Sequence, residues 1–310
     1  MTVTPAERWY EHRTYSHRDF PVDRLAASRT DTVSICLPAR DCARTVGPMV
    51  EALAGLRDRG VVDQIVVVDA ASDDGTAEVA AGAGAEVHQE AELMPRFGPP
   101  LGKGDAMWRA LSVLTGDVVC YLDADTEDFG EHFACGTLGP VLCEPGVAFS
   151  KAFFRRPFKV GETIDPHGGG RVTELSARPL LNMFFPGLAG FIQPLAGEMA
   201  GRRALFERIP FACGYAVETA MLIDVHREAG LDALAQVDLE VRQNRHQTLR
   251  QLVPMAYNVT MAVASRLQRE ERLVPTPVAP LHSFEAGAIV ARPMELVERP
   301  AMSTLGATAT

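Results

Sequence analysis

The chain lacks the features that would place it in a membrane, in an export pathway or on a nucleic acid. No apolar run reaches the roughly 20 residues that a membrane-spanning helix needs. The N-terminus, MTVTPAERWYEHR, has no apolar stretch of the kind found in signal peptides. The net charge of -10 argues against non-specific nucleic-acid binding, which needs a basic surface. We therefore expect a cytoplasmic protein that binds neither membranes nor nucleic acids.

Cysteine occurs without any informative pattern. The six cysteines include no CxxC pair and no zinc-binding spacing, so they are expected to be free thiols in a reducing compartment. Cys36 and Cys120 lie inside apolar runs and should be buried as small hydrophobic side chains. Cys42 lies in a loop that we expect to belong to the functional site.

What the chain does contain is an alternation of apolar strands and amphipathic helices. Continuous apolar runs at residues 33–37, 65–68 and 118–122 predict buried strands. Both faces of these strands are apolar, and helical segments separate them along the chain. This is the pattern of a parallel sheet that is covered by helices on both sides, so we predict an α/β fold.

Local signals set the expected boundaries in this half. Helical spacing covers residues 45–56 and about 105–114, and a short strand is expected near Val87. Pro38 should stop the first strand, because proline cannot donate a ladder hydrogen bond. Ser72 is expected to cap the helix that follows the second strand.

The second half of the chain is less regular. We expect helices at residues 173–183 and 217–229 and a strand at residues 234–241. A further helix should follow Leu249. It contains Pro254, which should either kink it or lie in its first turn.

Polar residues follow three of the predicted strands, at PARD (38–41), DAASD (69–73) and DAD (123–125). The carboxyl ends of parallel strands meet at one edge of the sheet, and ligands bind beyond that edge. The two carboxylates of Asp123 and Asp125 would suit a hard divalent cation, Mg²⁺ or Mn²⁺. A turn or a helix cap is the simpler explanation of such a motif, but the three strand ends together favour the metal site.

Two glycine-rich turns precede predicted helices. In the first, Gly102 and Gly104 flank Lys103, whose charge could meet a phosphate; an ordinary loop with a solvated lysine is the alternative. In the second, three glycines are followed by Arg171 and Thr173 in GGGRVTE. Backbone N–H groups, a guanidinium and a hydroxyl at a helix start favour an anion site over a flexible turn with a cap.

Taken together, these motifs resemble the glucosyl-3-phosphoglycerate synthases, which are retaining glycosyltransferases of GT-A fold. The resemblance runs from about residue 32 to near the end of the chain. The segments that carry it are GKGDAMWRAL, GDVVCYLDAD, GGGRVTELSARPLLN, AGFIQPLAGEMAGRR, GYAVETAMLID, GLDALAQVDLEVR and ERPAM.

The resemblance implies a Rossmann-like, nucleotide-sugar-binding sheet and a role for each matching residue. It implies catalytic roles for Asp125, Glu218 and Lys103. The donor-binding residues implied are Pro38, Ala39, Arg40, Asp69, Lys103, Asp123 and Ala124. The acceptor-binding residues implied are Gly169, Arg171 and Thr173. Glu218 would contact the transferred sugar, and Mg²⁺ or Mn²⁺ would be the cofactor, held by Asp123 and Asp125.

Along one continuous GT-A domain we expect four regions. They are an N-terminal arm (1–30), a nucleotide-sugar-binding region (31–155), an acceptor-binding region (156–269) and an extended tail (270–310) that wraps over the body or over a partner. We also expect a homodimer.

The sequence departs from the family at the donor side. The first loop usually reads LPA-x-[N/D]-E-E, but here both glutamates are missing after Asp41, and the second loop, usually DSGS, reads DAAS. The family's third metal ligand is a histidine, and Asn244 stands at that position. Asn244 could ligate through its carbonyl, His246 could substitute, or His246 could be a plain surface residue.

Three functions remain open at this point. The default is a glucosyl-3-phosphoglycerate synthase that joins a sugar from a nucleotide-sugar donor to a small acidic acceptor. The second is a paralogue from specialised metabolism with a GDP-sugar and another acceptor such as a small thiol, as in lincosamide-type S-glycosyltransferases. The third is a non-catalytic protein that binds nucleotide sugars.

Overall fold

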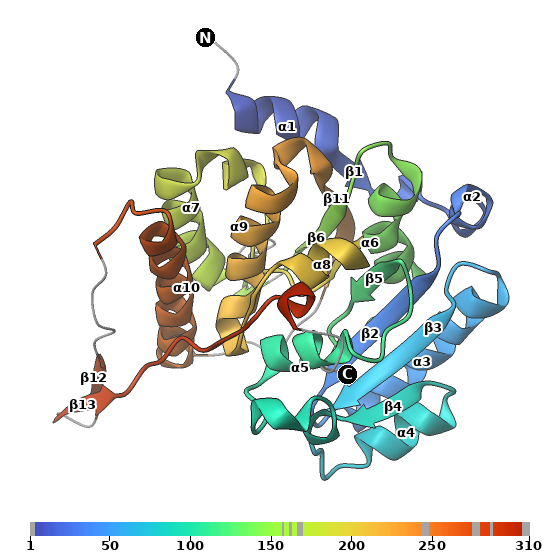
Figure 1. The fold of residues 1–310 in the computed structure, drawn as a ribbon, viewed down its shortest axis with the longest axis horizontal. Helices are drawn as coiled ribbons and strands as arrows, with labels where there is room; N and C mark the ends of the chain where they lie inside the picture. The colour runs from blue at the N-terminus through green and yellow to red at the C-terminus, as the bar shows by residue number, and fades with distance from the viewer. Residues whose placement is uncertain are drawn as a thin grey trace.

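The computed structural model describes residues 4–156, 158–160, 163–165, 170–242, 248–274, 280–285 and 288–305. At its centre lies an eight-stranded sheet (Figure 1). In their order across the sheet, the strands are β1 (Thr14–Ser16), β11 (Leu234–Val241), β6 (Phe149–Arg155), β9 (Met199–Arg202), β5 (Val118–Tyr121), β2 (Val33–Ala39), β3 (Gln64–Asp69) and β4 (Glu86–Gln89).

The sheet is mixed rather than fully parallel. Strand β9 runs antiparallel to both of its neighbours, β5 and β6, while all other pairings in the sheet are parallel. The expectation of a parallel sheet is therefore right for the β2–β5 half and needs correction at β9. This strand has only four residues, too few to show a period in the sequence.

Helices cover both faces, and alternate residues of each strand point to opposite cores. Ile35 and Leu37 of β2 belong to one core, and Cys36 between them belongs to the other. The first core is completed by α2 (Val22–Ser28), α3 (Ala43–Asp58), α4 (Thr76–Gly82) and α6 (Glu131–Cys143). The second is completed by α1 (Pro5–Arg13), α5 (Lys103–Ala110), α7 (Arg178–Phe184), α8 (Arg203–Arg208), α9 (Val217–Ala229) and α10 (Leu249–Arg269).

Several predicted elements are confirmed. The helix expected at 217–229 is α9, the strand expected at 234–241 is β11, and the helix expected at 45–56 lies within α3. Cys36 and Cys120 are fully buried, as expected of small hydrophobic residues, and burial raises the pKa of both thiols.

Pro38 does not stop β2, which continues to Ala39. Pro38 lies opposite Val68 of β3, but its main-chain groups point towards β5 on the other side. Cys36, two residues earlier, points the same way, and its carbonyl accepts from the Leu122 N–H. Strand β5 has already ended at Tyr121 on that side. The missing N–H of proline therefore leaves no ladder bond unmade.

Two helix starts also differ from expectation. Ser72 does not cap α4; the N-cap is Gly75, with φ of 86°, and Ser72 bonds to Asp69 instead. Helix α5 begins at Lys103, two residues earlier than expected, and ends at Ala110. Pro254 lies in the second turn of α10, where the Asn258 side chain donates to its carbonyl at 3.0 Å.

In the predicted N-terminal arm (1–30), the residues from Thr4 onward pack against the body. They form α1, the edge strand β1 and α2, and both Trp9 and Phe20 are buried. The Trp9 indole donates to the Leu234 carbonyl at 2.8 Å. These contacts escaped prediction because the segment has no clear hydrophobic period.

The C-terminal region is only partly an extended tail. It contains an antiparallel hairpin of β12 (Leu281–Glu285) and β13 (Ala288–Arg292), which lies apart from the rest of the molecule in Figure 1. Strand β14 (Glu298–Arg299) then returns and pairs with β10 (Phe211–Ala212), so this part of the region lies against the body. Arg299 holds the buried Asp105 of α5 through two hydrogen bonds of 2.6 and 2.8 Å.

A second, smaller hairpin pairs β7 (Phe158–Val160) with β8 (Thr163–Asp165). Within the part of the chain that the structure describes, no helix is long and apolar enough to cross a membrane.

Candidate active site

The predicted site residues gather beyond the carboxyl ends of the central strands. Asp123 follows β5, Lys103 opens α5 and Glu218 lies in the first turn of α9. Gly104 lets α5 approach the chain after β10, because a Cβ there would collide with the Ala212 carbonyl. The fold thus brings together three residues that are far apart in sequence.

Lys103 joins two carboxylates. Its Nζ donates to Glu218 Oε1 at 2.9 Å and also to Asp123 Oδ1. Burial disfavours the charged ammonium, but the two carboxylates outweigh this effect and raise the pKa of Lys103. The side chain stays 30% exposed, so the fixed positive charge remains accessible to a ligand.

Arg242 is a site residue that the sequence analysis missed. It directly follows β11, and its guanidinium meets Asp123 Oδ2 at 3.1 Å, Asp125 Oδ1 at 2.9 Å and the buried Glu198. Burial alone would lower the pKa of Arg242, but the three carboxylates raise it. The pKa of Asp123 is lowered because Lys103 and Arg242 outweigh the opposing effect of its burial.

The segment just before β9 packs against Asp123. Gly197 lies against the Asp123 carboxylate, so closely that a Cβ at this position would overlap the carboxylate atoms. The buried Lys151 of β6 donates to the neighbouring Ala196 carbonyl at 2.6 Å. Burial lowers the pKa of Lys151 to about 8. A lone lysine inside the apolar run VAFSKAFF was the available signal for this residue.

The carboxylates of Asp123 and Asp125 fit the expected divalent cation. Their oxygens are hard ligands, they already converge on one cationic group, and the Asp125 side chain is 67% exposed. Asn244 and His246, the candidates for a third ligand, lie outside the described residues. Among the described residues, no three His, Cys, Asp or Glu side chains form a complete metal cluster.

The expected nucleotide-binding residues lie at the same carboxyl edge of the sheet, some exposed and some buried. Arg40 is exposed at the end of β2, and Ala39 before it is buried. Asp69 is buried as well, and its carboxylate accepts from the Ser72 hydroxyl at 2.5 Å and from Gln89 Nε2 at 3.0 Å. The carbonyl of Ala124 accepts from Thr45 Oγ1 at 2.6 Å. Through these hydrogen bonds the buried Asp69 carboxylate fixes the conformation of the second loop.

The first loop, which lacks the family's glutamates, is tied to its neighbour through main-chain donors. The N–H of Asp41 donates to Ser72 Oγ at 2.9 Å, and the N–H of Cys42 donates to Thr76 Oγ1 at 2.8 Å. Asp41 has a positive φ of 53°. Cys42 is buried at the start of α3, and burial raises the pKa of its thiol.

The expected acceptor segment opens the helix that leads into α7. Gly170 has a positive φ of 73°, which suits glycine, and Arg171 and Thr173 follow in the first turn. Residues Thr173–Ala177 form a π-helical turn, a geometry often found at functional sites. This turn lies against α10, where Ser176 Oγ donates to the Ala256 carbonyl at 3.2 Å. Gly169 lies outside the described residues.

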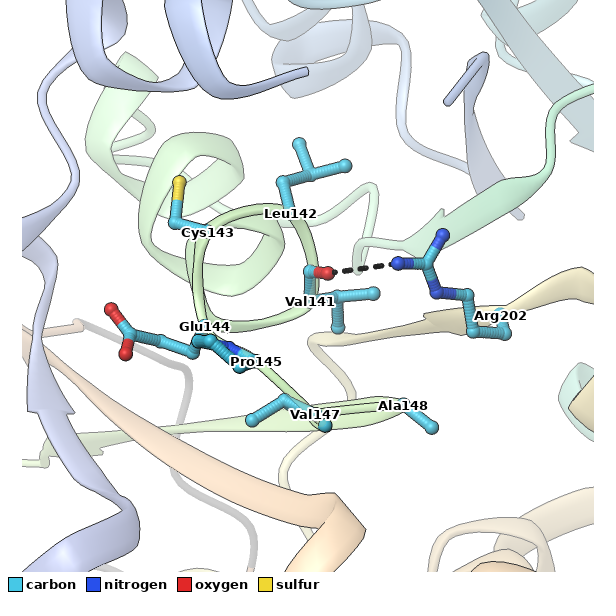
Figure 2. Close-up of a pocket in the computed structure, with 9 residues that line it drawn as sticks. Val141, Leu142, Cys143, Glu144, Pro145, Val147, Ala148 and Arg202 are labelled. Carbon is cyan, nitrogen blue, oxygen red and sulfur yellow. Dashed lines mark hydrogen bonds between the residues drawn. The ribbon is translucent and has the colours of Figure 1, made fainter. Parts of the chain in front are cut away.

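A separate hollow of about 460 Å³ lies at the opposite edge of the sheet, before the start of β6 (Figure 2). Residues 141–148 line it together with Arg202, whose Nη2 donates to the Val141 carbonyl at 3.4 Å. None of the predicted site residues reaches this hollow.

Comparison with known proteins matches residues 34–139 to glycosyl transferase family 2. The chain is 42% identical to the glucosyl-3-phosphoglycerate synthase of Mycolicibacterium smegmatis over 260 residues, which cover 84% of this chain and 86% of that protein. It is 35% identical to the enzyme of the same name from Petrotoga mobilis over 305 residues, 94% of both chains.

Solved structures are similar over nearly the whole chain. The mannosyl-3-phosphoglycerate synthase from Rubrobacter xylanophilus has 49% identity and a TM-score of 0.88, over 97% of this chain and 98% of that one. The glucosyl-3-phosphoglycerate synthase from Mycobacterium tuberculosis, in complex with Mn²⁺, UDP-glucose and phosphoglyceric acid, has 36% identity and a TM-score of 0.81, over 94% and 98%. The predicted GT-A fold is confirmed.

Proposed function

Because the chain belongs to the glucosyl-3-phosphoglycerate synthase family of glycosyltransferases, we propose that it transfers a hexose from a nucleoside diphosphate sugar to 3-phosphoglycerate. The observation that carries this proposal is the position of Lys103, held between Asp123 and Glu218 beyond the strand ends. The identity of 35–42% to glucosyl-3-phosphoglycerate synthases over most of the chain favours catalysis over binding of nucleotide sugars alone.

Asp123 and Asp125 are the residues that would hold Mn²⁺ or Mg²⁺, with Asn244 or His246 as candidates for a third ligand. When bound, the ion supplies positive charge to the leaving diphosphate. Asp123 is held in place by Lys103, Arg242 and Gly197, so its carboxylate needs little rearrangement. Asp125 is the more exposed of the two and completes the pair from the solvent side.

Lys103 and Glu218, which touch each other, act on two adjacent groups of the donor. The Lys103 ammonium meets the diphosphate, and Glu218 contacts the hexose and fixes its orientation. In the reaction, the bond between the anomeric carbon and the diphosphate oxygen breaks. A bond to the acceptor hydroxyl forms on the same face, and the hydroxyl proton leaves with the diphosphate. The configuration of the sugar is thereby retained.

Arg171 and Thr173 hold the acid groups of the acceptor, and Gly169 completes this pocket in the prediction from the sequence. The positive φ of Gly170 turns the chain into the helix, so that main-chain N–H groups of the first turn can also face an anion. A guanidinium, a hydroxyl and main-chain N–H groups together suit a phosphate or a carboxylate.

The base of the donor is the open choice. Pro38, Ala39, Arg40 and Asp69 belong to the donor side, but the first loop lacks the two family glutamates. Arg40 stands exposed at its start. This difference favours a GDP-sugar as the second candidate donor beside UDP-glucose, and the 49% identity to a mannosyl-3-phosphoglycerate synthase makes mannose a candidate hexose beside glucose.

The deciding experiment incubates the protein with Mn²⁺, UDP- or GDP-hexoses and 3-phosphoglycerate, and it identifies products by mass. We expect a hexosyl-3-phosphoglycerate from at least one donor. The Asp125→Ala variant is the matched control: it should stay folded, because the side chain is exposed, and should form no product. Product formation that Asp125→Ala leaves undiminished would contradict the proposed site.

We also infer that the protein is a homodimer. Large apolar side chains are exposed in the turn before α7, in α7, at the start of α10 and after its end, namely Leu175, Met183, Leu249, Leu273 and Val274. The hairpin of β12 and β13 extends away from the body on the same side as α7 and α10 (Figure 1). A second copy would cover both. Light scattering after size-exclusion chromatography should give twice the chain mass, and Met183→Asp should halve it.

A further inference from the structure

We propose that Arg242 is an internal counter-cation of Asp123 and Asp125, and that a divalent cation has to exchange with it at these carboxylates. The inference rests on the proposed metal site. It adds a positioning role for Arg242, which couples binding of the metal to binding of the donor.

The contacts of Arg242 are those of a cation enclosed among carboxylates. Its Nη2 meets Asp125 Oδ1 at 2.9 Å, and its Nη1 meets both Asp123 Oδ2 at 3.1 Å and Glu198. The side chain is buried, and its guanidinium lies over the Phe154 ring at 5.3 Å. This arginine is therefore not a surface side chain that reaches the site by chance.

Both oxygens of Asp123 are already engaged, Oδ1 with Lys103 and Oδ2 with Arg242. A divalent ion needs the lone pairs of the same carboxylates at short distance. It would also lie next to the positive charge of Arg242, and the repulsion between like charges is strong in a partly buried site. An ion that arrives alone must therefore displace the guanidinium from at least one carboxylate.

Glu198 keeps Arg242 in the site during this exchange. The Glu198 carboxylate is buried and pairs with Nη1 of Arg242, whereas Asp125 pairs with Nη2. The main-chain carbonyl of Glu198 accepts from the Ala152 N–H at 3.0 Å, which fixes the residue to β6. The guanidinium can leave Asp125 and remain paired with Glu198. A diphosphate that arrives with the ion brings negative charge for both cations, so metal and donor should bind cooperatively.

The test measures binding of Mn²⁺ alone, without nucleotide, by electron paramagnetic resonance or calorimetry. In Arg242→Gln we expect Mn²⁺ to bind at least about tenfold more tightly than in the wild type, because the competing cation is gone. Arg202→Gln is the matched control. It removes one positive charge from an arginine that is also paired with an aspartate, Asp31, but at the opposite edge of the sheet. Its Mn²⁺ affinity should not change.

A second variant controls for misfolding of Arg242→Gln and for binding of the metal by the released Glu198 carboxylate. Arg242→Gln leaves Glu198 buried without its partner, which can destabilise the fold or offer a third carboxylate to the metal. The double variant Arg242→Gln/Glu198→Gln removes both charges, and it too should bind Mn²⁺ more tightly than the wild type. Unchanged or weaker Mn²⁺ binding in both folded variants would overturn the exchange.

The same titrations separate this inference from the proposed function. If the wild type binds no Mn²⁺ even with a nucleoside diphosphate present, the metal site itself is wrong. If it binds Mn²⁺ with nucleotide, but the arginine variants gain no affinity for Mn²⁺ alone, the site is right and the exchange is wrong.

Discussion

The two halves of the central sheet bury different kinds of side chain. The half formed by β2, β3 and β5 has a nearly continuous apolar interior, and its charged groups stand beyond the strand ends. The half around β9, β6 and β11 buries Lys151, Glu198 and Arg242 next to the site. The first half is a platform that fixes where the loops start, while the second sets the electric field around the reacting groups. Substitutions in the two halves should therefore fail in different ways.

The largest effect is expected in the charged half, from Gly197→Ala. The backbone tolerates alanine, but the new Cβ overlaps the Asp123 carboxylate and must displace it. We expect kcat/KM to fall by about a hundredfold or more, because small displacements of a catalytic group are costly. Gly82→Ala in α4 is the control, since its Cβ meets nothing within 4 Å. Wild-type turnover in Gly197→Ala would show that Asp123 does not need its present position.

Leu53→Ala should have the opposite profile in the apolar half. Leu53 is completely buried between α3 and the sheet, so truncation leaves a cavity. We expect the free energy of unfolding to fall by about 2.5 kcal/mol in urea titrations, with kcat unchanged at low temperature. Glu51→Ala, at an exposed position on the same helix, should leave stability unchanged. A large loss of kcat in folded Leu53→Ala would contradict the expectation that substitutions in the apolar half affect stability alone.

Lys151→Met should make the buried charge visible as a pH effect. Burial lowers the pKa of Lys151 from 10.5 to about 8. Between these values the unfolded chain binds a proton that the folded chain does not, so the wild type gains stability as the pH rises. Relative to Lys151→Met, its free energy of unfolding should rise by about 2 kcal/mol between about pH 8.5 and pH 10. Parallel stability curves for the two proteins would contradict the lowered pKa.

The smallest effect should come from Glu90, at the β4 margin of the apolar half. Burial and then Asp105 raise its pKa from 4.5 to about 7, and its Oε1 is buried without a hydrogen-bond partner. Between these two pKa values the Glu90 carboxyl keeps its proton in the folded chain and loses it in the unfolded chain. The free energy of unfolding therefore falls as the pH rises from 4.5 to about 7. Relative to Glu90→Gln, the wild type should lose about 1 kcal/mol between about pH 5 and pH 6. Calorimetric melting of both proteins across this range checks the sign.

The same contrast explains what the sequence could predict. Continuous apolar runs encode buried parallel strands, so β2, β3 and β5 and the polar residues at their ends followed from local pattern. Lys103 was proposed from its glycine-rich turn and Glu218 from the family resemblance, but their contact joins residues 115 positions apart and could not be read from the sequence. Arg242 and Lys151 were missed because a buried charge depends on partners far along the chain, and no local period records such partners. The antiparallel β9 was missed because it is too short.

The ion pair between Arg299 and Asp105 has a consequence for the order in which the structure can form during synthesis. Asp105 lies two residues after Lys103 in α5, and its partner Arg299 is synthesised 194 residues later. A nascent chain on the ribosome that has already produced the entire sheet still carries Asp105 without this partner, and β10 still lacks β14. Arg299 therefore joins α5 only after the strands of the sheet have been made. A chain truncated shortly before residue 299 would contain nearly every predicted site residue and yet leave Asp105 without the two hydrogen bonds from Arg299.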